Sequence, residues 1–169
     1  MGPCRTTIVL MRIDVVTISD RCSRGLMQDT AGPAVIALIR AHWPEAEIDT
    51  RLLPDEEDQI AEVLREFAAA GTALVLTVGG TGLSPRDRTP EATRRVIDRE
   101  APGLAEAMRS IGAERNQFAW LSRGVAGLAG QTLIVNLPGS RRGAEESLAA
   151  ILNLLQHALD VSAGGQNHP

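Results

Sequence analysis

The chain has 169 residues, 44% of them hydrophobic, which is enough for one domain with its own core and excludes a disordered chain. The net charge is −4, the arginines are scattered, and only two Trp and two Phe are present, so we expect no nucleic-acid partner. No apolar run reaches the roughly 18 residues of a membrane span, and no secretory signal is recognisable, so we expect a cytoplasmic protein without a membrane partner.

The first half of the chain alternates predicted strands and helices. Residues 12–19 form a β-branched apolar run typical of a buried strand, and a polar turn separates them from a helix over 33–43 with Pro in its first turn. Residues 46–53 alternate apolar and charged side chains, as a strand near a sheet edge does. Residues 54–71 show the i, i+3, i+4, i+7 spacing of a helix that Gly71 ends. Residues 72–78 are the most apolar and predict a central strand.

The second half continues with helices over 90–100 and 103–113, the first of them capped by Thr89. Two strands around Gly130 are expected within 123–137, and a final helix from Ser140 to about Asp160. We expect an N-terminal extension (1–11), a single domain (12–160) and a flexible tail (161–169). This alternation predicts an α/β fold with three layers, in which helices cover a mostly parallel central sheet.

The sequence contains no lysine, which excludes a Walker A phosphate loop and catalysis through a lysine Schiff base. The short motifs of common hydrolases, metalloproteases and dinucleotide-binding proteins are also missing. Cys4 and Cys22 form no spaced motif, and the three histidines lie far apart, so no zinc site is expected.

A polar motif follows each of four predicted strands. The motifs are Ser19-Asp20, Pro54-Asp55-Glu56, Gly79-Gly80-Thr81-Gly82 and Asn136-Leu137-Pro138-Gly139-Ser140. In open parallel sheets, ligands bind outside the carboxyl ends of the strands. The four motifs are therefore expected to line one crevice.

Each motif also has a purely structural interpretation. Asp55 and Ser140 could cap helices, the glycines could form a tight turn, and Asp87 could hydrogen-bond its own backbone. Glycine also lets backbone N–H groups approach phosphate oxygens closely. Taken together, two carboxylates beside such a loop favour phosphoryl or nucleotidyl chemistry with a divalent ion.

Residues 79–93, GGTGLSPRDRTPEAT, resemble the signature of the Mog-type molybdopterin adenylyltransferases of molybdenum cofactor biosynthesis. The stretches VTISDRCSRGLMQDTAG, RLLPDEE, APGLAEAMR, LSRGVAG and TLIVNLPGS follow in the family's order, so that the resemblance covers nearly all of 12–159. It implies a molybdopterin-binding-domain-like fold and a homotrimer. It also implies AMP transfer from Mg-ATP to the terminal phosphate of molybdopterin, with release of pyrophosphate.

The resemblance also implies roles for individual residues. Asp55 and Asp87 match the family's catalytic carboxylates and would hold Mg²⁺. The residues that match its substrate-binding motifs are Ser19, Asp20, Gly79, Gly80, Thr81, Gly82, Ser84, Arg86, Asn136, Pro138, Gly139 and Ser140. The pterin phosphate is the nucleophile in this chemistry, so no Ser, Cys or Lys nucleophile is required.

Several alternatives stay open at this point. Arg141-Arg142 stand where the family often has Pro-Lys, and Arg offers a planar fork in place of a point charge. The pathway could use molybdenum or tungsten, and the product could be handed to a metal-insertion protein. A non-catalytic carrier or scaffold of the same fold is the alternative function.

Overall fold

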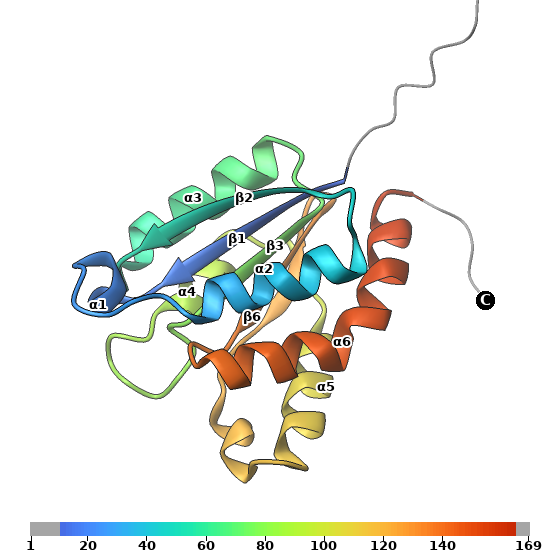
Figure 1. The fold of residues 1–169 in the computed structure, drawn as a ribbon. Coiled ribbons are helices and arrows are strands. Elements are labelled where there is room, and N and C mark those ends of the chain that lie inside the picture. Colours follow the sequence, from blue (N-terminus) through green and yellow to red (C-terminus); the bar gives the residue numbers. More distant parts are fainter. Residues whose placement is uncertain (1–10, 165–169) are drawn as a thin grey trace, which may run out of the picture.

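The computed structural model describes residues 11–164 and shows one six-stranded sheet with the strand order β2-β1-β3-β6-β5-β4 (Figure 1). Four strands run parallel: β1 (Arg12–Ile18), β2 (Glu47–Leu53), β3 (Leu74–Val78) and β6 (Thr132–Leu137). At the other edge, β5 (Ala126–Ala129) runs antiparallel to β6, and β4 (Arg99–Glu100) antiparallel to β5. The mostly parallel sheet, with β3 inside it and β2 at its edge, was predicted correctly.

Helices cover both faces of this sheet. On one face lie α2 (Ala31–His42), α5 (Pro102–Ala113) and α6 (Arg141–Ser162); on the other lie α3 (Glu57–Ala69) and α4 (Thr89–Arg94). Two short elements complete the chain: α1 (Asp20–Ser23) after β1, and the 3₁₀-helix η1 (Gln117–Leu121) after α5. The three-layer α/β prediction is confirmed.

The inner strands are mostly apolar because both of their faces are buried. Alternate residues of β1 belong to different cores: Ile13 and Val15 pack beneath α2 and α6, whereas Val16 and Ile18 pack beneath α3. Asp14 of this strand is fully buried and accepts a hydrogen bond from Thr72 Oγ1. Because β1 is buried on both faces, its carboxyl end is fixed in position, and the motif Ser19-Asp20 begins directly after it.

The helix predicted over 90–100 is wrong in its second half. Helix α4 ends at Arg94, and the chain then pairs with β5, where the Asp98 N–H donates to Leu128 O and the Ala101 N–H to Ala126 O. These partners lie about thirty residues away in sequence, so local helix propensity does not reveal them. Thr89 does not cap the helix either: it is the first helical residue, and its hydroxyl donates to Gly79 O.

Two helix ends also differ from expectation. Helix α2 begins at Ala31, before the expected Pro33, because the Asp29 carboxylate accepts hydrogen bonds from the Ala31 and Gly32 N–H groups. Helix α6 continues to Ser162, past the expected end near Asp160.

Most of the predicted extension (1–11) and the end of the predicted tail lie outside the described residues. No helix within 11–164 is long and apolar enough to cross a membrane.

Candidate active site

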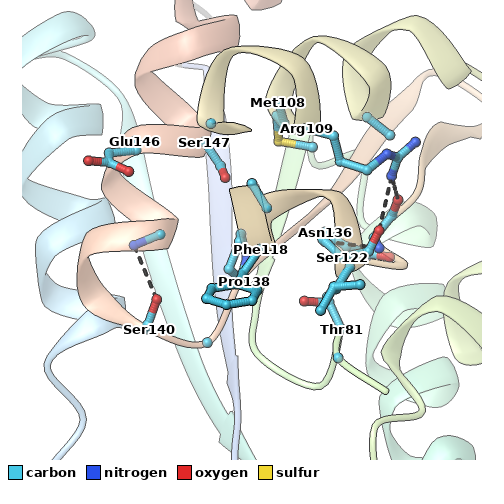
Figure 2. Close-up of a pocket in the computed structure, with 18 of the residues that line it drawn as sticks. Thr81, Met108, Arg109, Phe118, Ser122, Asn136, Pro138, Ser140, Glu146 and Ser147 are labelled. Carbon is cyan, nitrogen blue, oxygen red and sulfur yellow. Dashed lines mark hydrogen bonds between the residues drawn. The ribbon is translucent and has the colours of Figure 1, made fainter. Parts of the chain in front are cut away.

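The four polar motifs meet at one edge of the sheet, as expected, but they line two cavities in place of the single crevice that was predicted. The cavity we call acidic has a volume of about 620 Å³, and the side chains of Asp20, Asp29, Asp55 and Asp87 line it beside those of Arg21 and Arg141. The cavity we call apolar has a volume of about 530 Å³ and is lined by parts of α5, η1 and the start of α6 (Figure 2). Both cavities are lined by Gly80, Asp87, Gly139 and Ser140, which we call the shared wall.

Glycine is required where the backbones converge at this wall. Gly79 and Gly80 have φ angles of 110° and 64°, a region that L side chains rarely adopt. A Cβ on Gly79 would collide with Ile18 O, and one on Gly139 would lie 3.1 Å from Gly79 Cα. The loops after β1, β3 and β6 therefore pack backbone against backbone, which leaves room for a ligand to approach the chain closely.

Asp20 and Asp55 join the loops after β1 and β2. The Asp20 N–H donates to Asp55 Oδ2 at 2.8 Å, and the Asp55 N–H donates to Asp20 Oδ1 at 3.2 Å. Arg86, from the loop after β3, donates two bonds to the Asp20 carboxylate and one to Glu56. The hydrogen bonds from Arg86 lower the pKa of Asp20, so this carboxylate stays ionised.

Asp55 is affected in the opposite direction. Partial burial raises the pKa of its carboxyl, and the negative charges of Asp20 and Asp87 raise it further. Asp55 and Asp87 therefore influence each other electrostatically, although 32 positions separate them in sequence. A site that concentrates negative charge in this way favours a bound cation.

The Asp87 carboxylate is held on one side only. Its Oδ2 accepts a hydrogen bond from the Ser84 N–H at 2.9 Å, and the Asp87 N–H donates to Ser84 O. Within the described residues, its Oδ1 accepts no hydrogen bond, and neither does Oδ1 of Asp55. One oxygen of each carboxylate is thus available to a ligand.

The apolar cavity contains residues that the sequence did not single out. Met108 and Arg109 come from α5, Phe118 and Leu121 from η1, and Glu146 from α6. Arg109 donates to the carbonyl oxygens of Ser122 and Gly124, and it forms no ion pair with a carboxylate of the described chain. Figure 2 shows Met108, Phe118 and Glu146 around the cavity, with Arg109 turned toward Ser122. The motifs APGLAEAMR and LSRGVAG pointed to this region without assigning it a role.

Asn136 lines the apolar cavity, but its side chain is buried and bonded within the protein. Its Nδ2 donates to Thr77 Oγ1 and Thr93 Oγ1, and its Oδ1 accepts from the Val125 N–H. The Asn136 side chain therefore connects β6 to β3, to α4 and to the residue that directly precedes β5. In this arrangement it positions the cavity wall and has little capacity left for a ligand.

We expect Asn136→Ala to lower the free energy of unfolding by about 2 kcal/mol, because buried polar partners lose their hydrogen bonds. Asn116→Ala is the matched control, since the Asn116 side chain accepts one exposed bond from the Phe118 N–H. That control should cost about 1 kcal/mol or less. Urea denaturation of both variants measures the difference, and equal losses would contradict the buried network.

Most of the predicted site residues come together as expected. Ser19, Asp20, Asp55 and Gly79 line the acidic cavity, Thr81, Gly82, Asn136 and Pro138 line the apolar cavity, and Gly80, Asp87, Gly139 and Ser140 line both. Ser84 and Arg86 line neither cavity: Ser84 holds Asp87, and Arg86 holds Asp20. Ser140 also caps α6, its Oγ accepting from the Gly143 N–H. Asp55 caps no helix, because Glu56 occupies the N-cap of α3.

Curated relatives match most of this chain. The molybdopterin adenylyltransferase of Escherichia coli is 44% identical over 158 residues, which is 90% of this chain and 81% of that protein. The molybdenum cofactor synthesis protein cinnamon of Drosophila melanogaster is 40% identical over 91% of this chain. This chain spans 27% of cinnamon and 22% of the gephyrin of Dictyostelium discoideum, so both are much longer proteins.

A solved structure and a family model point to the same family as these relatives. The molybdopterin biosynthesis enzyme MoaB of Thermus thermophilus superposes with a TM-score of 0.85 at 52% identity, covering 92% of this chain and 98% of that one. The family model described as "probable molybdopterin binding domain" matches residues 14–157. The chain therefore belongs to the Mog-type family of molybdenum cofactor biosynthesis proteins that carry this molybdopterin-binding domain.

Proposed function

We propose that this protein is a molybdopterin adenylyltransferase, which transfers AMP from ATP to the terminal phosphate of molybdopterin and releases pyrophosphate. The observation that carries the proposal is the shared wall, where Asp87 and two glycine backbones stand between two cavities. One substrate in each cavity would bring their phosphates together at that wall. Relatives named molybdopterin adenylyltransferase, 42% and 44% identical to this chain, support the same reaction.

The reaction joins two phosphates. A phosphate oxygen of molybdopterin attacks the α-phosphorus of ATP, the bond to the bridging oxygen breaks, and pyrophosphate leaves with that oxygen and its electron pair. The protein's part is to position both groups and to stabilise negative charge. The Gly80 and Gly139 backbone lets the phosphates approach, and Arg141 offers a cation on the acidic side of the wall.

The substitution of Arg141-Arg142 for Pro-Lys is compatible with this account. Both arginines pair with a glutamate four residues later, Arg141 with Glu145 and Arg142 with Glu146. Arg141 lines the acidic cavity, and Arg142 lines neither cavity. We therefore assign the anion-binding role to Arg141.

A magnesium ion fits the residues present. Carboxylate oxygens suit Mg²⁺, and Asp55 and Asp87 each leave one oxygen without a hydrogen bond. Within 11–164 no group of three or more His, Cys, Asp or Glu side chains forms a metal site, so the nucleotide phosphates would complete the ligand set. When bound, Mg²⁺ would neutralise charge on the triphosphate and on the departing pyrophosphate.

We expect Asp55→Asn to stop turnover and yet to raise Tm by about 2 °C at neutral pH. Asparagine keeps the bond from the Asp20 N–H and removes a partly buried charge that Asp20 and Asp87 repel. A pKa raised by folding means that the carboxylate costs stability above that pKa, and the cost disappears as the pH falls through it. The gain in Tm should therefore shrink toward about pH 4.

Calorimetry of the wild type, Asp55→Asn and the control Asp58→Asn over this pH range tests the expectation. Asp58 lies in the first turn of α3, three residues after Asp55. Its side chain is 90% exposed and pairs with Arg95, so its replacement should change Tm little. If Asp55→Asn were less stable than wild type at neutral pH, the negative charge of Asp55 would not be what lowers the stability of the wild type.

The function itself is tested by incubating the protein with molybdopterin, ATP and MgCl₂ and measuring pyrophosphate and adenylylated pterin together. An enzyme produces both in equal amounts, and omission of molybdopterin abolishes both. A carrier binds the pterin without forming either product, and a scaffold binds neither substrate. The homotrimer, the choice of metal and the hand-over to a metal-insertion protein stay predictions.

A further inference from the structure

Arg123, just before β5, contacts the back of the loop that carries Asp87. Its backbone N–H donates to Thr81 O at 2.9 Å, its Nε donates to Gly82 O at 2.7 Å, and its Nη2 donates to Asp87 O. One residue thus holds three carbonyl groups of the loop that joins β3 to α4. The guanidinium supplies two of these three bonds, those to Gly82 O and Asp87 O, and it is suited to this because its N–H groups are fixed in one plane.

Glu91, in the first turn of α4, fixes the same guanidinium. Arg123 Nη1 donates to Glu91 Oε1, and its Nη2 lies 3.5 Å from Glu91 Oε2. Both side chains are partly shielded from water, with exposures of 33% for Arg123 and 27% for Glu91. Partial burial, the largest single effect, raises the pKa of the Glu91 carboxyl. The hydrogen bond and charge of Arg123, a backbone hydrogen bond and the charge of Arg88 together outweigh it, so the pKa of Glu91 is lowered.

The backbone of this loop has few anchors to the rest of the domain apart from Arg123. Residues 82–88 contain no helix or strand, and most of them are exposed. The hydrogen bond between the Ser84 N–H and the Asp87 carboxylate lies within the loop and does not anchor it to the domain. The side chains of Arg86 and Arg88 also reach outside the loop, Arg86 to Asp20 and Glu56 and Arg88 to Glu57, but these ion pairs do not contact the backbone of the loop.

We propose that Arg123 and Glu91 are positioning residues that set the location of Asp87 for adenylyl transfer without contacting either substrate. This inference rests on the proposed function, because it assigns the residues a role in that reaction. Arg123 and Glu91 line neither the acidic nor the apolar cavity, so their removal leaves the substrate-binding surfaces in place. Displacement of a catalytic group by about 1 Å is enough to lower a rate about 100-fold.

The test compares Arg123→Ala with Arg95→Ala. Arg95 also joins α4 to carboxylates, Glu57 and Asp58, but it touches no carbonyl of the loop. We expect Arg123→Ala to lower kcat by about 10- to 100-fold, with KM for ATP and for molybdopterin changed less than about threefold. Guanidinium chloride, far below denaturing concentration, should restore part of kcat in Arg123→Ala and none in Arg95→Ala.

Hydrogen exchange gives a readout that does not depend on activity. Amides of residues 81–88 should exchange about tenfold faster in Arg123→Ala than in wild type or Arg95→Ala. Glu91→Gln keeps Arg123 and should show a smaller loss of kcat that guanidinium does not restore. If Arg123→Ala fails to fold, Glu91→Gln provides the test of the positioning role.

The outcomes separate this inference from the proposed function. An inactive wild type contradicts the function, and exchange of the loop then decides the positioning role alone. In an active wild type, an Arg123→Ala variant with unchanged kcat or unchanged loop exchange overturns the inference. An equal loss of kcat in Arg95→Ala would also overturn it, because it would show general destabilisation of α4.

Discussion

Replacing Asp87 with asparagine is expected to lower the rate of adenylyl transfer by about 100- to 1000-fold. Asp87 lies on the shared wall, so its carboxylate faces both cavities at the point where the phosphates would meet. Asparagine keeps an oxygen that accepts from the Ser84 N–H, and the loop therefore keeps its shape. The variant removes the negative charge with little other change.

The loss should appear in kcat and leave pterin binding largely intact. Molybdopterin affinity, measured by fluorescence titration, should change less than about threefold, because interactions made only in the transition state affect kcat. Asp58→Asn, on the exposed start of α3, is the control and should keep full activity. Normal rates of product formation by Asp87→Asn would remove Asp87 from the catalytic machinery.

Replacing Gly79 with alanine is expected to lower the free energy of unfolding by about 3 kcal/mol or more. Its φ of 110° disfavours any L side chain, and the added Cβ would collide with the carbonyl oxygen of Ile18. That carbonyl belongs to the end of a fully buried strand and has no room to retreat. The loops after β1 and β3 would have to separate, which would also disrupt both cavities.

Gly71→Ala provides the matched control for this second variant. Gly71 also has a positive φ, 76°, but no atom lies within 4 Å of the position its Cβ would take. Alanine there should cost about 1 kcal/mol, which is the backbone strain alone. Thermal and urea denaturation of the two variants isolate the effect of close packing, and similar losses would contradict the contact with Ile18.

The main features of the fold were predictable because they follow from local pattern. Both faces of β1 and β3 are buried, and both strands accordingly are rich in apolar and β-branched residues. The alternation of side chains in β2 matched its place at the edge. The four polar motifs could be assigned to one edge because parallel strands end together. This argument placed Asp55 beside the glycine-rich loop, and the family resemblance paired it with Asp87; both side chains line the acidic cavity.

The features that sequence reasoning missed depend on contacts between distant residues. The short α4 results from pairing between Asp98 and Leu128, and the apolar cavity forms only when η1 folds beside α5. Arg86, predicted to bind substrate, lines neither cavity and pairs with Asp20 and Glu56, partners that its place in the sequence does not reveal. Arg123 stood in a recognised motif, but its three carbonyl partners are identifiable only in the folded chain.

The most direct test of the shared wall is a crystal structure of the protein with Mn²⁺, molybdopterin and a non-hydrolysable ATP analogue. We expect an anomalous manganese peak between Asp55 and Asp87, the α-phosphate against Gly80 and Gly139, and the pterin phosphate on the opposite side of the wall. Phosphates bound away from the wall, or a metal ion with neither aspartate as a ligand, would contradict the account.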